Sequence, residues 1–185
     1  MEESEYLASR FGLENLVDCT SVMLEARVIK TPWEIEVLRE NAKASERAMY
    51  KTAQATVPGM TPQDIHYLFH RFCLEESPNM TAVSQAHTFG STYTPAWIPD
   101  DMRLNYGDLV RLDGGPYANG YKSDLARTYA VGGSTTPERE QLFAELYKGY
   151  EYALAHIGPG VRMCDVFHGV ESVIKIPGYV RGHFG

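Results

Sequence analysis

The chain has 185 residues, 44% of them hydrophobic, and 17 basic against 24 acidic side chains give a net charge of −7. This length suits one sizeable core, and the lack of a lysine- or arginine-rich run argues against a nucleic-acid partner. No apolar run approaches the roughly 18 residues that a membrane span needs, and the acidic start MEESEYLASRF is unlike a secretory signal. We therefore expect a cytoplasmic protein with neither nucleic acid nor membrane as a partner.

Residues 1–29 read as the tail of a preceding domain followed by a linker, and residues 30–185 as the main domain. Within the first segment, Leu13–Leu16 predicts a short helix and Val22–Leu24 a short strand.

Two long helices are expected next. The sequence Thr31-Pro32-Trp33-Glu34 is a capping box with proline at the first helical position. Side chains at helical spacing continue the helix up to Pro58-Gly59, and we expect them to form its buried face: Ile35, Leu38, Ala42, Ser45 and Met49. A second helix is expected from Thr61-Pro62-Gln63-Asp64 to Ser77-Pro78.

Beyond Pro78 the pattern changes to short strands, which are predicted at Thr81–Ser84, Leu109–Leu112 and Tyr121–Val131. A third helix is predicted from about Thr135 until Gly158-Pro159-Gly160 ends it, and a fourth helix is predicted after this turn.

A short internal repeat links the two ends of this main domain. Residues 58–65 and 159–166 share a Pro-Gly-x-x-x-x-Asp-(Ile/Val) frame, each between two predicted helices. The chain reaches Gly185 where the strands of the second copy should begin, so a repeat of roughly 100 residues is suggested without its second set of strands. Those strands would cover the hairpin from Leu109 to Val131, and we expect its apolar face to be exposed in this chain.

Two aspartates in this hairpin carry the chemistry. An apolar strand ends in Asp113, a loop rich in glycine follows, and the next strand carries Asp124. In a hairpin both carboxylates can point to one face, where they repel each other unless a proton or a cation lies between them. Their oxygens suit hard divalent cations. On spacing alone, Asp113 could instead be a turn residue, and Asp124 could pair with Lys122 or Arg127.

The stretches GDLVRLDGG (107–115) and GYKSDLARTYAVGG (120–133) resemble the metal-binding hairpin of metallopeptidase family M24. This family includes Xaa-Pro aminopeptidases, prolidases, methionine aminopeptidases and the metal-free creatinases. The stretch from Arg27 to Ile35 is similar to the family's entry helix, and the likeness covers residues from about 20 to 185. It implies an α+β pita-bread (creatinase/aminopeptidase) fold, incomplete here: the first αβ half and the helices of the second. Residues 30–185 would then be a C-terminally truncated catalytic domain.

The resemblance also implies two divalent metal ions, manganese, cobalt or zinc, held by two aspartates, one histidine and two glutamates. Asp113 and Asp124 match the aspartates. His183 stands where the histidine is expected, as a metal ligand and catalytic residue, although a residue beyond Gly185 is an alternative. Both glutamates would lie beyond Gly185.

For the substrate, the family's peptidases usually place a histidine a short distance before the first aspartate, where this chain has Ala96 or Trp97. We expect Trp97 to line the substrate pocket. His87, further upstream, is a second candidate for substrate contact, with an ordinary loop or core role as the alternative.

The resemblance thus implies a metal-dependent hydrolase of the Xaa-Pro aminopeptidase type, a homodimer when full length, that cleaves an N-terminal Xaa-Pro or related peptide bond. The fragment itself would be inactive. Two alternatives remain open. One is a family relative that hydrolyses a non-peptide amide or amidine, like a creatinase or an ectoine hydrolase, and the missing histidine favours it. The other is a non-catalytic pita-bread binding module, against which the two aspartates count.

Overall fold

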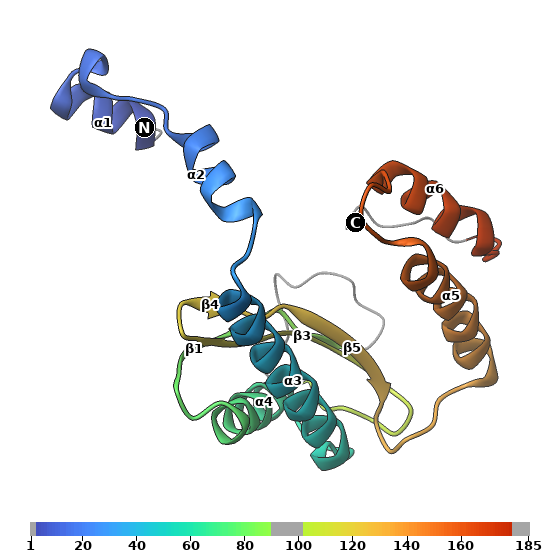
Figure 1. Ribbon diagram of the computed structural model, residues 1–185. Coiled ribbons are helices and arrows are strands. Elements are labelled where there is room, and N and C mark those ends of the chain that lie inside the picture. The colour runs from blue at the N-terminus through green and yellow to red at the C-terminus, as the bar shows by residue number, and fades with distance from the viewer. Residues whose placement is uncertain (1–2, 90–101, 179–185) are drawn as a thin grey trace.

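The computed structural model describes residues 3–89 and 102–178. The N-terminal part holds helix α1 (Glu3–Phe11), a single 3-10 turn (Leu13–Asn15) and helix α2 (Thr20–Val28). The main body begins with helices α3 (Pro32–Ala55) and α4 (Pro62–Glu76). Its strands are β1 (Met80–Gln85), β2 (Thr88–Phe89), β3 (Leu109–Ala118), β4 (Tyr121–Lys122) and β5 (Leu125–Ala130). Helices α5 (Pro137–His156) and α6 (Met163–Val173) follow (Figure 1). Within the described ranges, no helix is long and apolar enough to cross a membrane.

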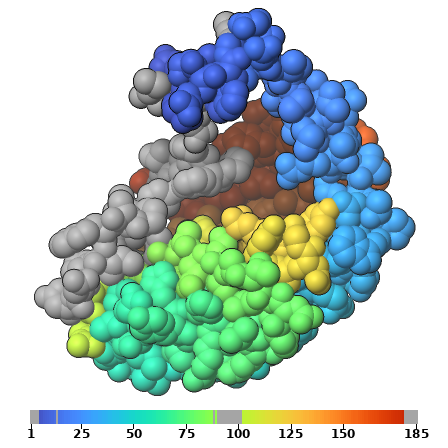
Figure 2. All heavy atoms as spheres, turned by 90° about the vertical axis from the view of Figure 1, so that its left-hand side faces the viewer, coloured from blue at the N-terminus to red at the C-terminus, as the bar shows by residue number. Residues whose placement is uncertain are grey.

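The two N-terminal helices extend from the beginning of α3 (Figure 1), and in the space-filling view their atoms form the blue arm at the top of the molecule (Figure 2). Helix α2 has no buried residue. The strand predicted at Val22–Leu24 is wrong, because these residues lie inside α2. The helix is favoured by the good helix formers that follow them, Glu25 to Arg27, and by Asp18, whose Oδ1 accepts the N–H of Thr20 at 2.8 Å. The domain division at residue 29 stays a prediction.

Helices α3 and α4 begin where their capping signals predict. In α3, Thr31 Oγ1 accepts the N–H of Glu34 and Glu34 Oε2 accepts the N–H of Thr31. Thr61 and Asp64 make the same reciprocal pair in α4. The predicted buried face of α3 is confirmed at Ser45 and Met49 and wrong at Ile35, which is exposed. The buried residues of the helix are Val37, Asn41, Ala44, Ser45, Ala48, Met49 and Thr52. Asn41 and Thr52 are polar, and the apolar spacing did not indicate them.

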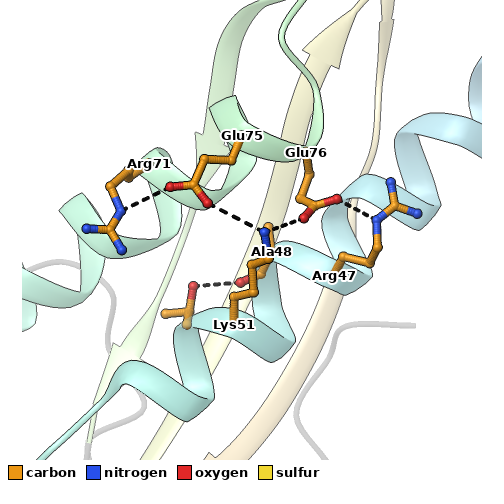
Figure 3. Close-up of polar contacts among 7 residues, drawn as sticks. Arg47, Ala48, Lys51, Arg71, Glu75 and Glu76 are labelled. Carbon is orange, nitrogen blue, oxygen red and sulfur yellow. Dashed lines mark hydrogen bonds and ion pairs between the residues drawn. The ribbon is translucent and has the colours of Figure 1, made fainter.

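A network of ion pairs joins α3 to α4 on their outer side (Figure 3). Lys51 Nζ lies 2.6 Å from Glu76 Oε1 and 3.5 Å from Glu75 Oε2. Arg47 Nε lies 2.5 Å from the other oxygen of Glu76, and Arg71 contacts Glu75 at 3.4 Å. Isolated pairs of this exposure contribute about 0–1 kcal/mol each. The network therefore fixes how the two helices lie against each other more than it stabilises the fold.

Strand β3 is the centre of an antiparallel sheet, with β1 and β2 along one edge and β4 and β5 along the other. The prediction that this strand ends at Asp113 is wrong, because β3 continues to Ala118. The turn that follows is tight: Asn119 and Gly120 both have positive φ, 53° and 80°. Asn-Gly is the preferred pair for a two-residue turn of this kind, so it decides where the hairpin reverses.

Helices α3 and α4 cover one face of the sheet. Val110, Leu112 and Val131 are fully buried there, in a core with Met49, Ile65, Phe69 and Phe72. The expectation of an exposed apolar hairpin face is therefore wrong. The apolar side chains of the hairpin point to the helices, and the opposite face carries mainly polar and small residues. In the hairpin, Tyr117 is the large apolar side chain that is exposed, and most of the others lie elsewhere in the described residues, several of them on α5: Phe143, Leu146, Tyr147, Tyr150 and Leu154.

The internal repeat has the same local structure in both copies. Helices α3 and α4 pack on each other, as do α5 and α6. Each pair is joined by a Pro-Gly turn whose glycine has positive φ, 89° at Gly59 and 82° at Gly160. In each copy the second helix begins three residues after that glycine, at Pro62 and at Met163. Figure 1 shows α5 joined to the end of β5 by a connecting segment, with the α5–α6 pair apart from the α3–α4 pair.

Candidate metal site

Asp113 and Asp124 lie on neighbouring strands of the hairpin. Asp113 pairs with Ala126 in the ladder of β3 and β5. Asp124 lies just before β5, and because the register is the same at Tyr117–Lys122 as at Gly114–Leu125, Asp124 falls opposite Gly115. The two aspartates are thus diagonal neighbours, a relationship that places Cα atoms about 7–8 Å apart across an antiparallel pair.

Both carboxylates point away from helices α3 and α4. The residues that alternate with Asp124 reach α3: Ser123 bonds to Ser45, Arg127 lies 3.8 Å from Glu46, and Tyr129 bonds to Thr56. Side chains alternate along a strand, so Asp124 and Ala126 face the opposite side. Asp113 shares that face, because Leu112 next to it is buried in the core. The Asp113 side chain is 21% exposed, and Asp124 is exposed.

The backbone before Asp124 is held by polar groups buried under α3. The hydroxyl of Ser123 donates to the Pro116 carbonyl at 3.1 Å and lies 2.6 Å from Ser45 Oγ. The Asn41 amide donates to the carbonyls of Ala118 and Tyr121, at 3.1 and 2.8 Å. Each of these bonds satisfies a group that would be costly to bury unpaired. Together they fix the hairpin on α3 and with it the position of Asp124.

The backbone of Asp113 is held from the other edge by His87. The Asp113 N–H donates to His87 Nδ1 at 3.1 Å. Nδ1 therefore carries no proton, and Nε2–H donates to Gln85 Oε1 at 3.1 Å. Burial, and after it electrostatic repulsion from His66 and Arg111, lowers the pKa of His87 to about 3, so its ring is neutral at physiological pH. With 2% of its surface exposed and both ring nitrogens hydrogen-bonded, the His87 side chain has no free nitrogen to offer a substrate.

Arg111 is a cationic side chain at this site. It shares the face of Asp113, two residues away on β3, and its Nη2 forms an ion pair with Asp113 Oδ2. The guanidinium carries five N–H donors in a fork suited to carboxylates. The 43% exposure of its side chain leaves part of the group open to solvent.

The structure argues against the two ordinary roles that spacing alone left open for the aspartates, a turn residue and a surface ion pair. Asp113 is not a turn residue, since it lies in the middle of β3. Among the described residues, no ion pair joins Asp124 to Lys122, and Arg127 turns to Glu46 on the other face of the sheet. The donor set, two carboxylates side by side on an accessible face, fits a hard divalent cation.

The remaining predicted site residues are not all placed. His183 and Trp97 lie outside the described residues. In the ranges 3–89 and 102–178, no group of three or more histidine, cysteine, aspartate or glutamate side chains is arranged to hold a metal ion. Sequence reasoning missed Arg111, Gln85 and Ser123. Only Arg111 left a signal, a charged residue interrupting the apolar run LVRL.

Comparison with known proteins places this hairpin in context. A family model described as metallopeptidase family M24 matches residues 36–185. The Xaa-Pro dipeptidase of Pyrococcus furiosus is 25% identical over 162 residues, which are 85% of this chain and 45% of that protein. The Xaa-Pro aminopeptidase of Escherichia coli K12 is 26% identical over 170 residues, 90% of this chain and 38% of that protein. The chain thus spans less than half the length of these relatives.

Solved structures agree in fold. The crystal structure of dipeptidase PepE from Mycobacterium ulcerans superposes with a TM-score of 0.77 at 27% identity, covering 92% of this chain and 46% of that one. The crystal structure of X-Pro aminopeptidase from Thermotoga maritima gives a TM-score of 0.76 at 23% identity, with coverage of 92% and 48%.

Proposed function

Because the chain belongs to metallopeptidase family M24, we propose that it is part of a metal-dependent hydrolase that cleaves an N-terminal Xaa-Pro or related peptide bond. The observation that carries the proposal is the placement of Asp113 and Asp124 as neighbours on the open face of the hairpin. The names of its relatives, Xaa-Pro dipeptidase and Xaa-Pro aminopeptidase, support this substrate class.

The fold predicted from the sequence is confirmed. The chain has an α+β pita-bread fold, and it covers about half of each solved structure that it resembles. The described residues contain the first αβ half, α3 to β5, and the helix pair of the second half, α5 and α6.

In the proposed site, Asp113 and Asp124 hold divalent metal, two ions of manganese, cobalt or zinc, together with His183. Such ions supply Lewis-acid activation of the scissile carbonyl and of the attacking water. The two aspartates contribute anionic oxygens. The backbone beside Asp124 is held by the bond of Ser123 to Ser45, and the backbone of Asp113 by its bond to His87. No residue of this chain is matched to the two glutamates that the family resemblance implies.

Trp97 is proposed to line the substrate pocket. An indole offers apolar surface and one N–H donor but exchanges no proton near neutral pH. Trp97→Phe is therefore expected to raise KM or change substrate preference and to leave kcat nearly unchanged. An unchanged substrate profile combined with a lower melting temperature would make Trp97 a core residue instead.

The metal assignment is tested in the natural full-length protein, including any residues that adjoin this chain. Asp113→Asn and Asp124→Asn each remove an anionic ligand and are expected to lower the metal content measured by elemental analysis. Asp165→Asn is the control, since Asp165 pairs with Arg162 on the surface of α6. Equal metal content in all four proteins would reject the assignment.

The reaction is tested with a panel of substrates given to the same protein. Ala-Pro, Ala-Pro-Ala and Ala-Ala distinguish Xaa-Pro cleavage from general peptidase activity. Creatine and ectoine test the second candidate, hydrolysis of a non-peptide amide or amidine, which is favoured by Ala96 and Trp97 where family peptidases carry a histidine. A protein that binds metal and cleaves none of these compounds would favour the binding module.

The homodimer and the cytoplasmic location stay predictions.

A further inference from the structure

At Asp113, the backbone N–H of β3 donates to a side chain instead of to a carbonyl of the neighbouring strand. On one side Gln85 of β1 pairs with Gly114, and on the other Thr88 of β2 pairs with Arg111. Ala86 and His87 lie between the two strands. The Ala86 N–H still donates to the Asp113 carbonyl at 2.9 Å, as in a regular ladder. The Asp113 N–H, however, donates to the His87 side chain at 3.1 Å. An imidazole nitrogen thus takes the position of a strand carbonyl at the residue proposed to bind metal.

We propose that His87 is a positioning residue for Asp113, and that Gln85 and His66 hold its ring in place. This inference rests on the proposed metal site. It assigns His87 a role through Asp113 rather than direct contact with a substrate.

The ring of His87 is fixed on all sides. Gln85 Oε1 accepts from His87 Nε2 at 3.1 Å and lies 3.2 Å from His66 Nδ1, so one amide oxygen joins both histidines. The His66 ring stacks on His87 with centroids 4.8 Å apart, and Phe69 meets His87 edge-on at 5.0 Å. His66 and Phe69 belong to α4. The network therefore ties the Asp113 backbone to the helix layer behind the sheet.

The bond to His87 Nδ1 also bears on the orientation of the Asp113 carboxylate. The direction of the Asp113 side chain depends on the backbone dihedrals of that residue, which the N–H bond restricts. Removing a hydrogen bond to a ligating side chain typically costs about 10–100-fold in metal affinity, and the bond from the Asp113 N–H acts on the same proposed ligand through its backbone.

The test uses two substitutions of His87 that match each other in size. His87→Leu removes the acceptor, whereas His87→Asn keeps an oxygen close to the position of Nδ1. Both lose the aromatic stack on His66. Co²⁺ is titrated into the metal-free natural full-length protein and followed by visible absorption, and hydrogen exchange of the Asp113 amide is measured without metal.

His87→Leu is expected to weaken Co²⁺ binding about 10–100-fold and to speed exchange of the Asp113 amide roughly two- to tenfold. His87→Asn is expected to retain most of both properties. Wild-type affinity and exchange rate in His87→Leu, or equal losses in the two variants, would overturn the proposal and leave only a packing role. Absence of Co²⁺ binding by the wild-type protein would instead reject the metal site, and the exchange measurement would still decide the role of His87.

A measurement on the unsubstituted protein guards against variants that fail to fold. Nitrogen-15 NMR should find His87 with its proton on Nε2 and a bare Nδ1 that accepts the Asp113 N–H. A proton on Nδ1 would exclude this hydrogen bond and overturn the proposal.

Discussion

The hydroxyl oxygens of Ser45 and Ser123 lie 2.6 Å apart, in a buried hydrogen bond between helix α3 and the hairpin that carries Asp124. Ser123 donates its own proton to the Pro116 carbonyl, so Ser45 is the donor in the shared bond. Gly115 makes this approach feasible: a Cβ at that residue would lie 2.0 Å from Ser45 Oγ and 2.3 Å from Ser123 Oγ.

The first prediction concerns this pair. Ser123→Ala should destabilise the fold by about 1–3 kcal/mol, because it leaves the fully buried Ser45 hydroxyl without its acceptor. Ser45→Ala should cost less, since Ser123 keeps Pro116 as a partner. In the double variant no donor is stranded, so its loss should be smaller than the sum of the single losses. Urea unfolding of the four proteins measures the coupling, and additive losses would show that the bond does not join the two elements.

The second prediction concerns Gly114, which follows Asp113. Its φ is 127°, and an added Cβ would lie 1.9 Å from the backbone oxygen of Ser84 on β1. Gly114→Ala should destabilise the fold by roughly 2–6 kcal/mol, since backbone strain and overpacking each cost about 1–3 kcal/mol. Gly133→Ala is the control: its φ is also positive, 86°, but no atom lies within 4 Å of the added Cβ. Melting temperatures that fall equally in both variants would mean that the contact with β1 adds nothing to the cost.

The helix starts were predicted well from the sequence, whereas the course of β3 was not. The capping boxes at Thr31 and Thr61 act over four residues, so α3 and α4 were predicted closely. The pair Gly114-Gly115 looked like the end of a strand, although β3 runs through it. Glycine is needed at these positions because β3 passes close to β1 at Gly114 and close to α3 at Gly115. Such close contacts depend on tertiary packing, which a local sequence pattern does not contain.

The candidate site was likewise predicted only in part. That Asp113 and Asp124 share a face follows from the period of a hairpin, and the structure agrees. The bond from the Asp113 N–H to His87 depends on a break between β1 and β2, which the sequence QAHTF does not mark. Asn41 and Ser45 were missed as anchors because a buried polar residue on a helix is recognised only once its partner is known.

The third prediction concerns pH and the contact between Glu34 and Tyr121. The Tyr121 hydroxyl donates to Glu34 Oε1. This bond, followed by those from the Thr31 backbone and hydroxyl, lowers the pKa of Glu34 from 4.5 to about 2. Between these values the unfolded chain binds more protons than the folded one, so the stabilisation is complete above pH 4.5 and is lost as the pH falls toward 2.

Tyr121→Phe removes the largest cause of this shift. Between pH 4.5 and 2, its stability should therefore fall less steeply than that of the wild type, and the gap between the two proteins should narrow as the pH falls. Urea midpoints measured at several pH values provide the comparison. A gap that stays constant over this range would show that the bond does not set the pKa of Glu34.

The last prediction concerns Arg111, which pairs with Asp113 on the metal-binding face. A guanidinium there repels an incoming divalent cation and occupies one oxygen of its ligand. Arg111→Gln should therefore bind Mn²⁺ roughly threefold to fivefold more tightly at low salt, equivalent to the 1 kcal/mol or less expected for a half-exposed pair. The difference should shrink as salt is added. Arg111→Lys keeps the charge and should stay near the wild type. Arg127→Gln is the matched control, since Arg127 lies on the neighbouring strand but faces Glu46 on α3. Weaker binding by Arg111→Gln would mean that the guanidinium aids the site by orienting the Asp113 carboxylate more than it hinders it by charge.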